Sequence, residues 1–279
     1  MKISIAVPSY NYSQYLESCL QSILEQDYKG FEVLIADGGS SDDSLNIIRR
    51  FCDQDQRFRL VSTDDNGQAD AVDKALAMAV GDILCFLNAD DCYVCRDALS
   101  RVVSAFENYS RADIVSFGGY YIDLEGKYIK PIRLRYHPLD SIALMKYRTA
   151  VVQPATFWRR HVQEKIRIRT DFHYVFDAAF FYEAYCSFSW VELLKPIAGY
   201  RLHDDNKSLQ IIPKRIDELA RFEQLKFGTM SYRVLYLKFV RFLVGNIKDI
   251  PIVGIYLCRF VYKIVNSLAF ITYYRLPSI

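Results

Sequence analysis

The strongest constraint on this chain is a repeated alternation of apolar runs with segments of helical periodicity. Helical spacing of apolar residues follows Asn11, which stands at capping-box distance from Gln14 and is predicted to cap that helix. The same spacing recurs over residues 42–51 and from Gly67 to a predicted helix end at Gly81. Strands that alternate with helices form a mostly parallel sheet with helices on both faces, so the sequence predicts an α/β fold. The runs that predict its strands are Ile3–Val7, Phe31–Ala36, Phe58–Ser62 and Ile83–Leu87.

Acidic residues follow two of these runs where each strand should end. Asp37 comes after the second run, and Asp90 with Asp91 comes after the fourth. Open α/β sheets bind ligands at the carboxyl ends of their strands, so we expect these carboxylates to face one crevice. Adjacent carboxylates repel each other unless a cation or hydrogen-bond donors offset their charge, and Mg²⁺ is held by such groups together with diphosphate oxygens. The alternative is that they cap a helix near residues 97–106, and this segment alone leaves both interpretations open.

Length and charge fit one large α/β domain with an appendage. The chain has 279 residues, of which about half are hydrophobic. Residues 1–212 hold 24 Lys and Arg against 29 Asp and Glu, whereas residues 213–279 hold 11 against 4. This distribution argues against nucleic-acid binding, which needs a basic patch on the folded domain. It favours contact of residues 213–279 with an anionic membrane surface.

The cysteines indicate a reducing compartment. Seven cysteines are an odd number, and we expect reduced thiols and a structural role for the Cys92 and Cys95 pair.

The two ends of the chain bear on its location in the cell. The first residues show no export-signal pattern. Arg259 and Lys263 interrupt the best apolar window near the end, which favours interfacial helices over a spanning helix, with packing on the domain as the alternative. We therefore expect a cytoplasmic protein, peripheral at the inner face of the membrane.

Several segments, in order, resemble those of the family 2 glycosyltransferases. They are Pro8–Asn11, Glu32–Asp42, Asp65–Ala71, Phe86–Asp91, Gln153–Trp158, Phe172–Asp177 and Gly199–His203. The resemblance covers roughly residues 2–209 and implies a GT-A fold. A nucleotide-binding half (1–95) would precede an acceptor half (96–212), and the basic, aromatic helical region 213–279 would follow as a membrane-interfacial appendage.

The resemblance also implies an activity. The enzyme would move one sugar from a nucleoside-diphosphate donor, foremost a UDP-sugar, to a glycan or lipid-linked glycan in cell-surface polysaccharide synthesis. The reaction would be an inverting single displacement, which needs an activated acceptor hydroxyl and a neutralised leaving group. Mg²⁺ or Mn²⁺ would be the cofactor. The sequence leaves the sugar, the acceptor and the oligomeric state open.

The resemblance further assigns roles to individual residues. Asp177 would be the catalytic base, with Asp171 in reserve. Asp91, Asp90 and His203 would bind the metal, and Arg201 with His203 would bind the diphosphate. The nucleotide-binding residues would be Pro8, Ser9, Tyr10, Asn11, Asp37, Gly67, Gln68, Asp70, Asn88 and Asp90.

Three other classes of protein share part of this pattern. A dinucleotide-dependent enzyme is disfavoured because no G-x-G-x-x-G follows the first strand. A processive synthase is disfavoured because the chain lacks a Q-x-x-R-W motif. A catalytically inactive GT-A-like nucleotide-binding or scaffold protein stays open, because Asn88 stands where many relatives carry Asp, and Ala178 and Ala179 stand where an acidic residue often follows the base.

Overall fold

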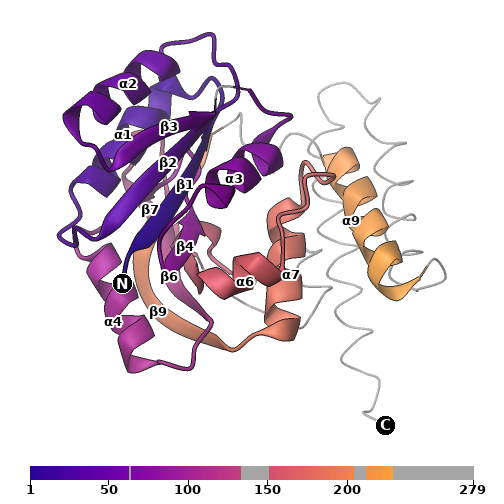
Figure 1. Cartoon of the computed structure of the whole chain (residues 1–279). Coiled ribbons are helices and arrows are strands. Elements are labelled where there is room, and N and C mark those ends of the chain that lie inside the picture. Colours follow the sequence, from indigo (N-terminus) through magenta and orange to yellow (C-terminus); the bar gives the residue numbers. More distant parts are fainter. Residues whose placement is uncertain (63, 133–150, 204–211, 229–279) are drawn as a thin grey trace. The chain divides into compact units, whose positions relative to one another are not determined.

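The computed structural model describes residues 1–62, 64–132, 151–203 and 212–228. The chain forms two compact units, residues 1–203 and 204–279. The first unit contains every predicted site residue and is an α/β fold (Figure 1). In the second unit, helix α9 (Ile212–Phe227) is described, while most of the expected membrane-interfacial region, residues 229–279, lies outside the described residues.

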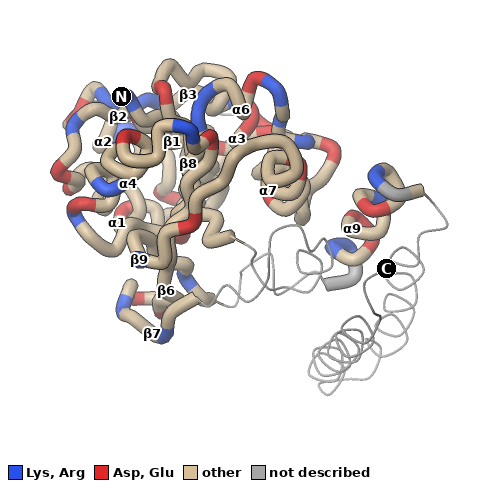
Figure 2. Tube along the Cα trace, turned by 90° about the horizontal axis from the view of Figure 1, so that it is seen from below, with Lys and Arg blue, Asp and Glu red and all other residues tan. Residues whose placement is uncertain are grey.

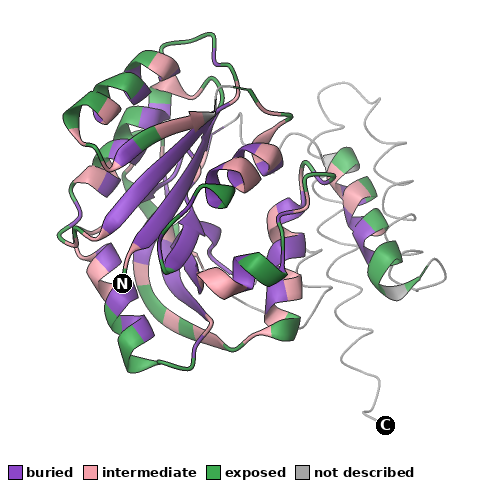
Figure 3. Cartoon of the chain, in the orientation of Figure 1, coloured by how far each residue is buried: buried purple, intermediate pink, exposed green. Residues whose placement is uncertain are grey.

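The amino-terminal half of the first unit is a parallel sheet in the order β3-β2-β1-β4. Its strands are β1 (Ile3–Ser9), β2 (Phe31–Asp37), β3 (Phe58–Ser62) and β4 (Ile83–Phe86). The connecting helices are α1 (Ser13–Leu24), α2 (Ser44–Gln54) and α3 (Gln68–Ala77). Helices α1 and α2 cover one face and α3 the other (Figure 1), so every residue of β1, β2 and β4 is buried (Figure 3). Burial on both faces explains why these strands are continuous apolar runs.

The second half extends the same sheet in the order β4-β8-β6-β9-β5, with β7 paired to β6. Strand β8 is antiparallel to both β4 and β6, whereas β6 and β9 are parallel. Its elements are β5 (Cys92–Tyr93), α4 (Ala98–Asn108), β6 (Ile114–Ile122), β7 (Tyr128–Pro131), η1 (Gln153–Ala155), β8 (Thr156–Arg159), α6 (Arg160–Lys165), α7 (Phe176–Ser187) and β9 (Trp190–Arg201). The predicted α/β fold, a sheet flanked by helices, is confirmed, and the antiparallel pairs belong to its second half.

Two predicted helix boundaries were wrong. Helix α1 follows Tyr12 without a side-chain cap, because Asn11 lies outside the helix with a left-handed φ of 56°. Helix α3 ends at Ala77 rather than at Gly81, and Gly81 lies in the turn before β4. A Cβ atom at Gly81 would lie 2.6 Å from Ser4 Oγ and 2.7 Å from the Lys2 carbonyl, so only glycine fits this close approach.

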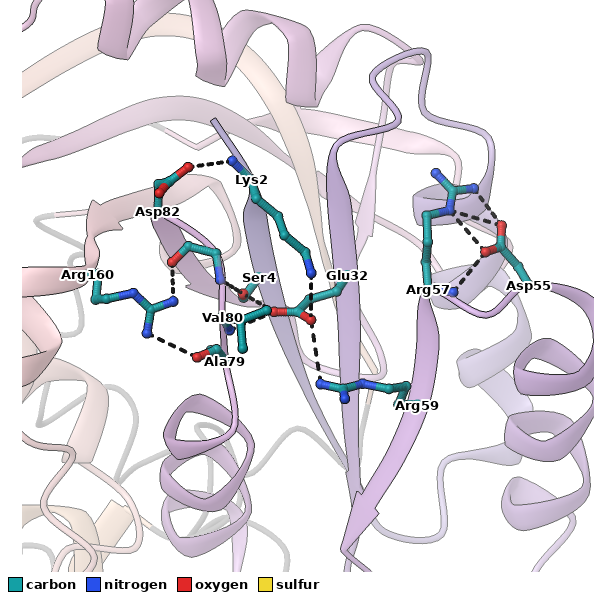
Figure 4. Close-up of polar contacts among 11 residues, drawn as sticks. Lys2, Ser4, Glu32, Asp55, Arg57, Arg59, Ala79, Val80, Asp82 and Arg160 are labelled. Atoms are coloured by element: carbon teal, nitrogen blue, oxygen red, sulfur yellow. Dashed lines mark hydrogen bonds and ion pairs between the residues drawn. The ribbon is translucent and has the colours of Figure 1, made fainter.

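The amino-terminal edge of the sheet is secured by the buried carboxylate of Glu32 (Figure 4). Glu32 accepts hydrogen bonds from the Ser4 hydroxyl (2.6 Å), the Val80 N–H (2.8 Å) and the Lys2 ammonium (3.0 Å). Although burial alone would raise the pKa of Glu32, these donors lower it below the ordinary value. The cluster therefore ties the turn after α3 to the first two strands, at the edge opposite the polar strand ends.

Charged residues of both signs are interspersed over the helices and loops of the first unit (Figure 2). Within the ranges that the structure describes, no helix has the length and apolar character needed to cross a membrane.

Candidate active site

Asp37 ends β2 directly beside Ser9, the last residue of β1. Its side chain is buried, and Oδ1 accepts the N–H groups of Ser40 (2.7 Å) and Gly39 (3.1 Å). Asp37 Oδ2 accepts the hydroxyl of Ser40 at 2.7 Å. The carboxylate thus organises the turn after its own strand, as Asp commonly does in turns, and Oδ2 keeps further acceptor capacity.

The loops after β1 and β2 are joined by reciprocal hydrogen bonds. The Asn11 N–H donates to Ser40 Oγ and the Ser41 N–H donates to Asn11 Oδ1, each at 2.8 Å. The Ser13 N–H donates to Asp42 Oδ2 at 2.9 Å. Asn11 can hold its positive φ because Asn tolerates the left-handed region better than most residues. The predicted nucleotide-binding residue Asn11 therefore positions both loops.

Tyr10 and Asp65 both lie close to Gly38. A Cβ atom at Gly38 would be 2.9 Å from Asp65 Oδ2 and 3.2 Å from Tyr10 Cδ2. Tyr10 is 58% exposed, so its side chain offers an aromatic surface at the carboxyl edge of the sheet. Partial burial raises the pKa of Asp65, and the charges of Asp70 and Asp37 raise it further. The Gly67 N–H, which donates to Asp65 at 2.8 Å, lowers this pKa in part. Sequence reasoning placed Asp65 in a motif without selecting it.

Pro8 and Ser9 form the end of β1. Pro8 is buried and paired with Ala36 of β2. The Ser9 hydroxyl is buried and has no hydrogen-bond partner among the described residues. A hydroxyl in this position, next to Asp37, can bind a ligand group that enters the edge of the sheet.

The loop before α3 brings a second set of polar groups to this edge. Gly67 precedes the helix with a φ of 111°, a conformation that favours glycine. Asp70 accepts the Asn66 N–H at 2.9 Å and pairs with Lys74 at 3.0 Å, so its carboxylate holds this loop. Gln68 Nε2 donates to Asn88 Oδ1 at 2.7 Å, which links α3 to the segment after β4.

Asp90 and Asp91 lie between β4 and β5, and the strand that follows excludes the helix-cap interpretation. Asp90 Oδ2 is 2.9 Å from His203 Nε2, and Asp91 Oδ1 accepts the Arg201 N–H at 3.0 Å. Burial raises the pKa of Asp91 well above its ordinary value, and the charge of Asp90 raises it further. The end of β9 thus meets both aspartates.

Arg201 is buried, and its guanidinium binds carbonyl groups of the fold. Nε donates to the Asp90 carbonyl at 2.7 Å, and one terminal nitrogen donates to Asp123 (3.0 Å) and Leu124 (2.6 Å). The ring of Tyr15 packs against both predicted diphosphate ligands, with Arg201 Cζ at 5.3 Å and the His203 ring centroid at 4.8 Å. Nothing in the local sequence singles out Tyr15, because its partners are far away along the chain.

Asn88 lies at the centre of a cluster of side-chain amides. Its Nδ2 group donates to Gln153 Oε1 at 3.0 Å and, more weakly, to Asp91 Oδ2 at 3.4 Å. Gln153, in η1, donates in turn to the Phe86 carbonyl at 2.7 Å. Sequence reasoning missed Gln153 as a site residue, although it opened one of the recognised segments.

Asp177 is a half-buried residue in the first turn of α7, where its Oδ1 accepts the N–H of Ala178 at 2.7 Å. The preceding residue, Phe176, packs on Phe86 of β4 with ring centroids 5.8 Å apart. His173 Nδ1 would be 3.3 Å from a Cβ atom at Gly67. The segment that carries Asp177 therefore lies beside the start of α3 and the end of β4. The reserve candidate, Asp171, is exposed and forms a two-pronged ion pair with Arg169 at 2.9 and 2.8 Å.

The family model named glycosyl transferase family 2 matches residues 4–187 of this chain. The chain belongs to glycosyltransferase family 2. It is similar to an uncharacterized glycosyltransferase of Haemophilus influenzae (37% identity, covering 46% of this chain and 51% of the relative). A PGL/p-HBAD biosynthesis glycosyltransferase of Mycobacterium bovis is 29% identical over 56% of this chain and 59% of its own length. The chain thus matches between half and three-fifths of the length of these two curated relatives.

Solved structures place this family 2 glycosyltransferase in the GT-A fold. Staphylococcus aureus TarS residues 1–349, in complex with UDP-GlcNAc, superposes with a TM-score of 0.63 at 16% identity, over 96% of this chain and 91% of TarS. The mannosyltransferase PcManGT of Pyrobaculum calidifontis, in complex with GDP-Man and Mn²⁺, gives 0.60 at 18% identity, over 100% and 76%. At these identities the likeness establishes the fold.

The side chains at this edge have the donor chemistry that a divalent cation needs. Two adjacent carboxylates and an imidazole, from Asp90, Asp91 and His203, suit Mn²⁺, and carboxylates suit Mg²⁺. Across the described residues, however, no group of three or more His, Cys, Asp or Glu side chains already has the arrangement of a metal site. Asp90 and His203 instead contact each other in this family 2 glycosyltransferase.

Proposed function

We propose that this family 2 glycosyltransferase moves one sugar from a nucleoside-diphosphate donor, foremost a UDP-sugar, to a glycan or lipid-linked glycan acceptor. One observation carries the proposal. The carboxyl edge of a single sheet gathers Asp37, the Asp90–Asp91 pair and the segment before Asp177, although they are far apart in sequence. Open α/β sheets bind nucleotides at this edge. The donors bound by TarS and PcManGT support the same class of ligand.

The nucleoside would bind where the loops after β1 and β2 meet. The exposed ring of Tyr10 offers a stacking surface for a base. Asp37 Oδ2 and the neighbouring Ser9 hydroxyl offer an acceptor and a donor at the same place. Asp65 adds a second carboxylate beside Tyr10, suited to a ribose hydroxyl.

Asp91, Asp90 and His203 would hold Mg²⁺ or Mn²⁺. A cation held by these residues would supply positive charge to neutralise the departing diphosphate. Arg201 and His203 would contact the diphosphate. The Arg201 guanidinium also binds the carbonyls of Asp90, Asp123 and Leu124, so it would hold the Asp90–Asp91 segment in place at the same time.

Asp177 would act as the general base. Its carboxylate takes the proton of the acceptor hydroxyl while that oxygen bonds to the anomeric carbon of the sugar. The bond from this carbon to the nucleoside diphosphate breaks in the same step, and the diphosphate leaves with the bonding electrons. A single displacement of this kind inverts the anomeric configuration.

Substitution of Asp177 by Asn tests the assignment. We expect Asp177→Asn to lower sugar transfer by a factor of about 100 or more, because general-base catalysis contributes that much, while UDP binding is retained. Transfer is measured as nucleoside diphosphate released from a panel of donors, with and without EDTA, and binding by calorimetry. Asp171→Asn is the matched control, since its exposed, Arg-paired side chain should leave turnover near that of the wild type.

Two results would contradict the proposal in different ways. Near-normal transfer by Asp177→Asn would remove the base assignment alone. A wild-type chain that binds UDP but releases no nucleoside diphosphate from any donor, with acceptor present, would favour the catalytically inactive, scaffold alternative.

We further propose that residues 213–279 hold the enzyme at the inner face of the membrane, where its product would enter cell-surface polysaccharide. The excess of 11 Lys and Arg over 4 Asp and Glu in this region supports attraction to anionic lipid. Flotation with vesicles tests this. We expect the full chain to float with vesicles rich in phosphatidylglycerol and to be released by about 1 M salt, because salt screens surface charge. Failure to float would contradict membrane contact.

A further inference from the structure

Three side-chain amides form a continuous hydrogen-bonded bridge across the candidate site. Gln68 begins α3 in the first half of the sheet, Asn88 follows β4, and Gln153 belongs to η1 before β8. The two links through Asn88 measure 2.7 Å to Gln68 and 3.0 Å to Gln153. The bridge therefore connects the nucleotide-binding half to the acceptor half through one residue.

The Phe86 carbonyl at one end of this bridge determines which group donates and which accepts in every hydrogen bond of the bridge. The Phe86 carbonyl can only accept, so Gln153 must turn its Nε2 group toward it, at 2.7 Å. Gln153 Oε1 then faces Asn88, which must present its Nδ2 group and turn Oδ1 toward the Gln68 donor. The second Nδ2 hydrogen of Asn88 is left to point at Asp91 Oδ2, 3.4 Å away.

Asp91 is held from two sides as a result. The Arg201 N–H binds Oδ1 and the Asn88 amide approaches Oδ2. Both carboxylate oxygens thus face donors, and the side chain is 1% exposed. Partners of this kind fix the orientation of a ligating carboxylate, and their loss commonly weakens metal binding by a factor of 10 to 100.

We propose that Gln153 and Gln68 are positioning residues that act through Asn88 to orient Asp91 for the cation. This inference rests on the proposed function, since it takes Asp91 as a metal ligand. In this arrangement Asn88 supplies the hydrogen-bond donor that the neighbouring amides require. Gln153 fixes the position of the acceptor half relative to the metal-binding segment.

The test is a titration of the full chain with Mn²⁺ in the presence of UDP, with free Mn²⁺ measured by electron paramagnetic resonance. We expect Gln153→Met to raise the Mn²⁺ dissociation constant about tenfold. In an Asn88→Ala background the same Gln153→Met change should have no further effect, because the bridge is already broken. An unchanged dissociation constant in Gln153→Met, or an equal loss in both backgrounds, would overturn the inference.

Two further variants separate positioning from general destabilisation. Gln26→Met removes a buried glutamine whose bonds go to Ser22, Cys95 and Leu99, and we expect normal Mn²⁺ binding from it. If Gln153→Met does not fold, Gln68→Met tests the bridge from its other end and should weaken Mn²⁺ binding in the same direction; an unchanged value would overturn the inference. A wild-type chain that binds no Mn²⁺ would instead overturn the proposed metal role, and this inference with it.

Discussion

Asn88 shows how a single atom type decides the organisation of the site. The Asn88 amide nitrogen donates to Gln153 Oε1 and, more weakly, to the Asp91 carboxylate. Gln153 Oε1 can only accept a hydrogen bond. A carboxylate at position 88 would place oxygen against oxygen at both contacts. The Asn at this position is therefore matched to its neighbours in this chain, whatever residue stands there in relatives.

Substitution of Asn88 by Asp should destabilise the apo protein. We expect Asn88→Asp to lower the free energy of unfolding by about 2 kcal/mol, because two partly buried hydrogen bonds are lost and a like charge is added beside Asp91. Urea denaturation at neutral pH without divalent cations measures the difference. Asn108→Asp, at an exposed position of α4, is the control and should change stability by less than about 0.5 kcal/mol. Equal stability of Asn88→Asp and wild type would contradict the argument.

At the residue scale, the sequence predicted those site residues that directly follow apolar runs. Asp37 ends β2, and Asp90 with Asp91 follows β4, so position alone sends them to the carboxyl edge of the sheet. Asp65 and Gln153 could not be selected in this way, because their importance comes from contacts with Gly38 and Asn88 that only the folded chain creates. The roles of the predicted residues, Asp177 included, remain predictions.

At the element scale, the two loops after β1 and β2 act as one structure. Their reciprocal bonds include the carboxylate of Asp42, which accepts the N–H groups of Ser13 and Ser44. The cap predicted for Asn11 was wrong because its side chain binds the neighbouring loop instead of its own helix. Local spacing shows which residues can cap a helix, but it does not show a competing partner 30 residues away.

The pH dependence of stability should report the bond between these loops. Burial alone would raise the pKa of Asp42, but bonds from Ser44 and Ser13 lower it to about 2, below the ordinary 3.8. A depressed pKa stabilises the fold above the unfolded value, and this stabilisation is lost as pH falls from about 4 toward 2. We expect wild type to exceed Asp42→Asn in stability at pH 6 and the two to converge near pH 2, by chemical denaturation. A difference that does not change with pH would contradict this.

The Glu32 cluster at the opposite edge should contribute more to stability than a surface ion pair (Figure 4). Glu32→Ala leaves Lys2, Ser4 and the Val80 N–H without their common acceptor, and we expect a loss of about 3 kcal/mol. The exposed pair of Glu25 and Arg96 gives the control, since we expect Glu25→Ala to cost only a small fraction of that loss. Thermal and urea unfolding compare the two, and similar losses would contradict the ranking.

At the scale of the whole molecule, one continuous sheet supports both halves of the site. The parallel half could be predicted from sequence, because long buried strands and their crossover helices leave strong periodic patterns. The second half could not, because β5 has two residues, β8 has four, and their places in the sheet depend on partners distant in sequence. The large sequence separation between paired strands, more than composition, limited the prediction of this half.

Donor and metal together should stabilise the folded chain by mass action. At concentrations 100 times the dissociation constant, UDP with Mn²⁺ should add about 2.7 kcal/mol to the free energy of unfolding, because the ligands bind only the folded state. Thermal unfolding with UDP alone, Mn²⁺ alone and both, followed by EDTA, measures this. We expect the stabilisation by UDP and Mn²⁺ together to exceed the sum of the stabilisations by each ligand alone if the cation bridges the site and the diphosphate. Strictly additive shifts would contradict a shared site.

The insertion of β8 between β4 and β6 restricts how the molecule can respond to its ligands. A hinge between the halves would have to break a backbone ladder, which costs far more than rearranging a loop. In the proposed reaction, the sheet would therefore set the geometry between donor and acceptor before either one binds. Any closure that excludes water from this reaction would then come from segments attached to the sheet.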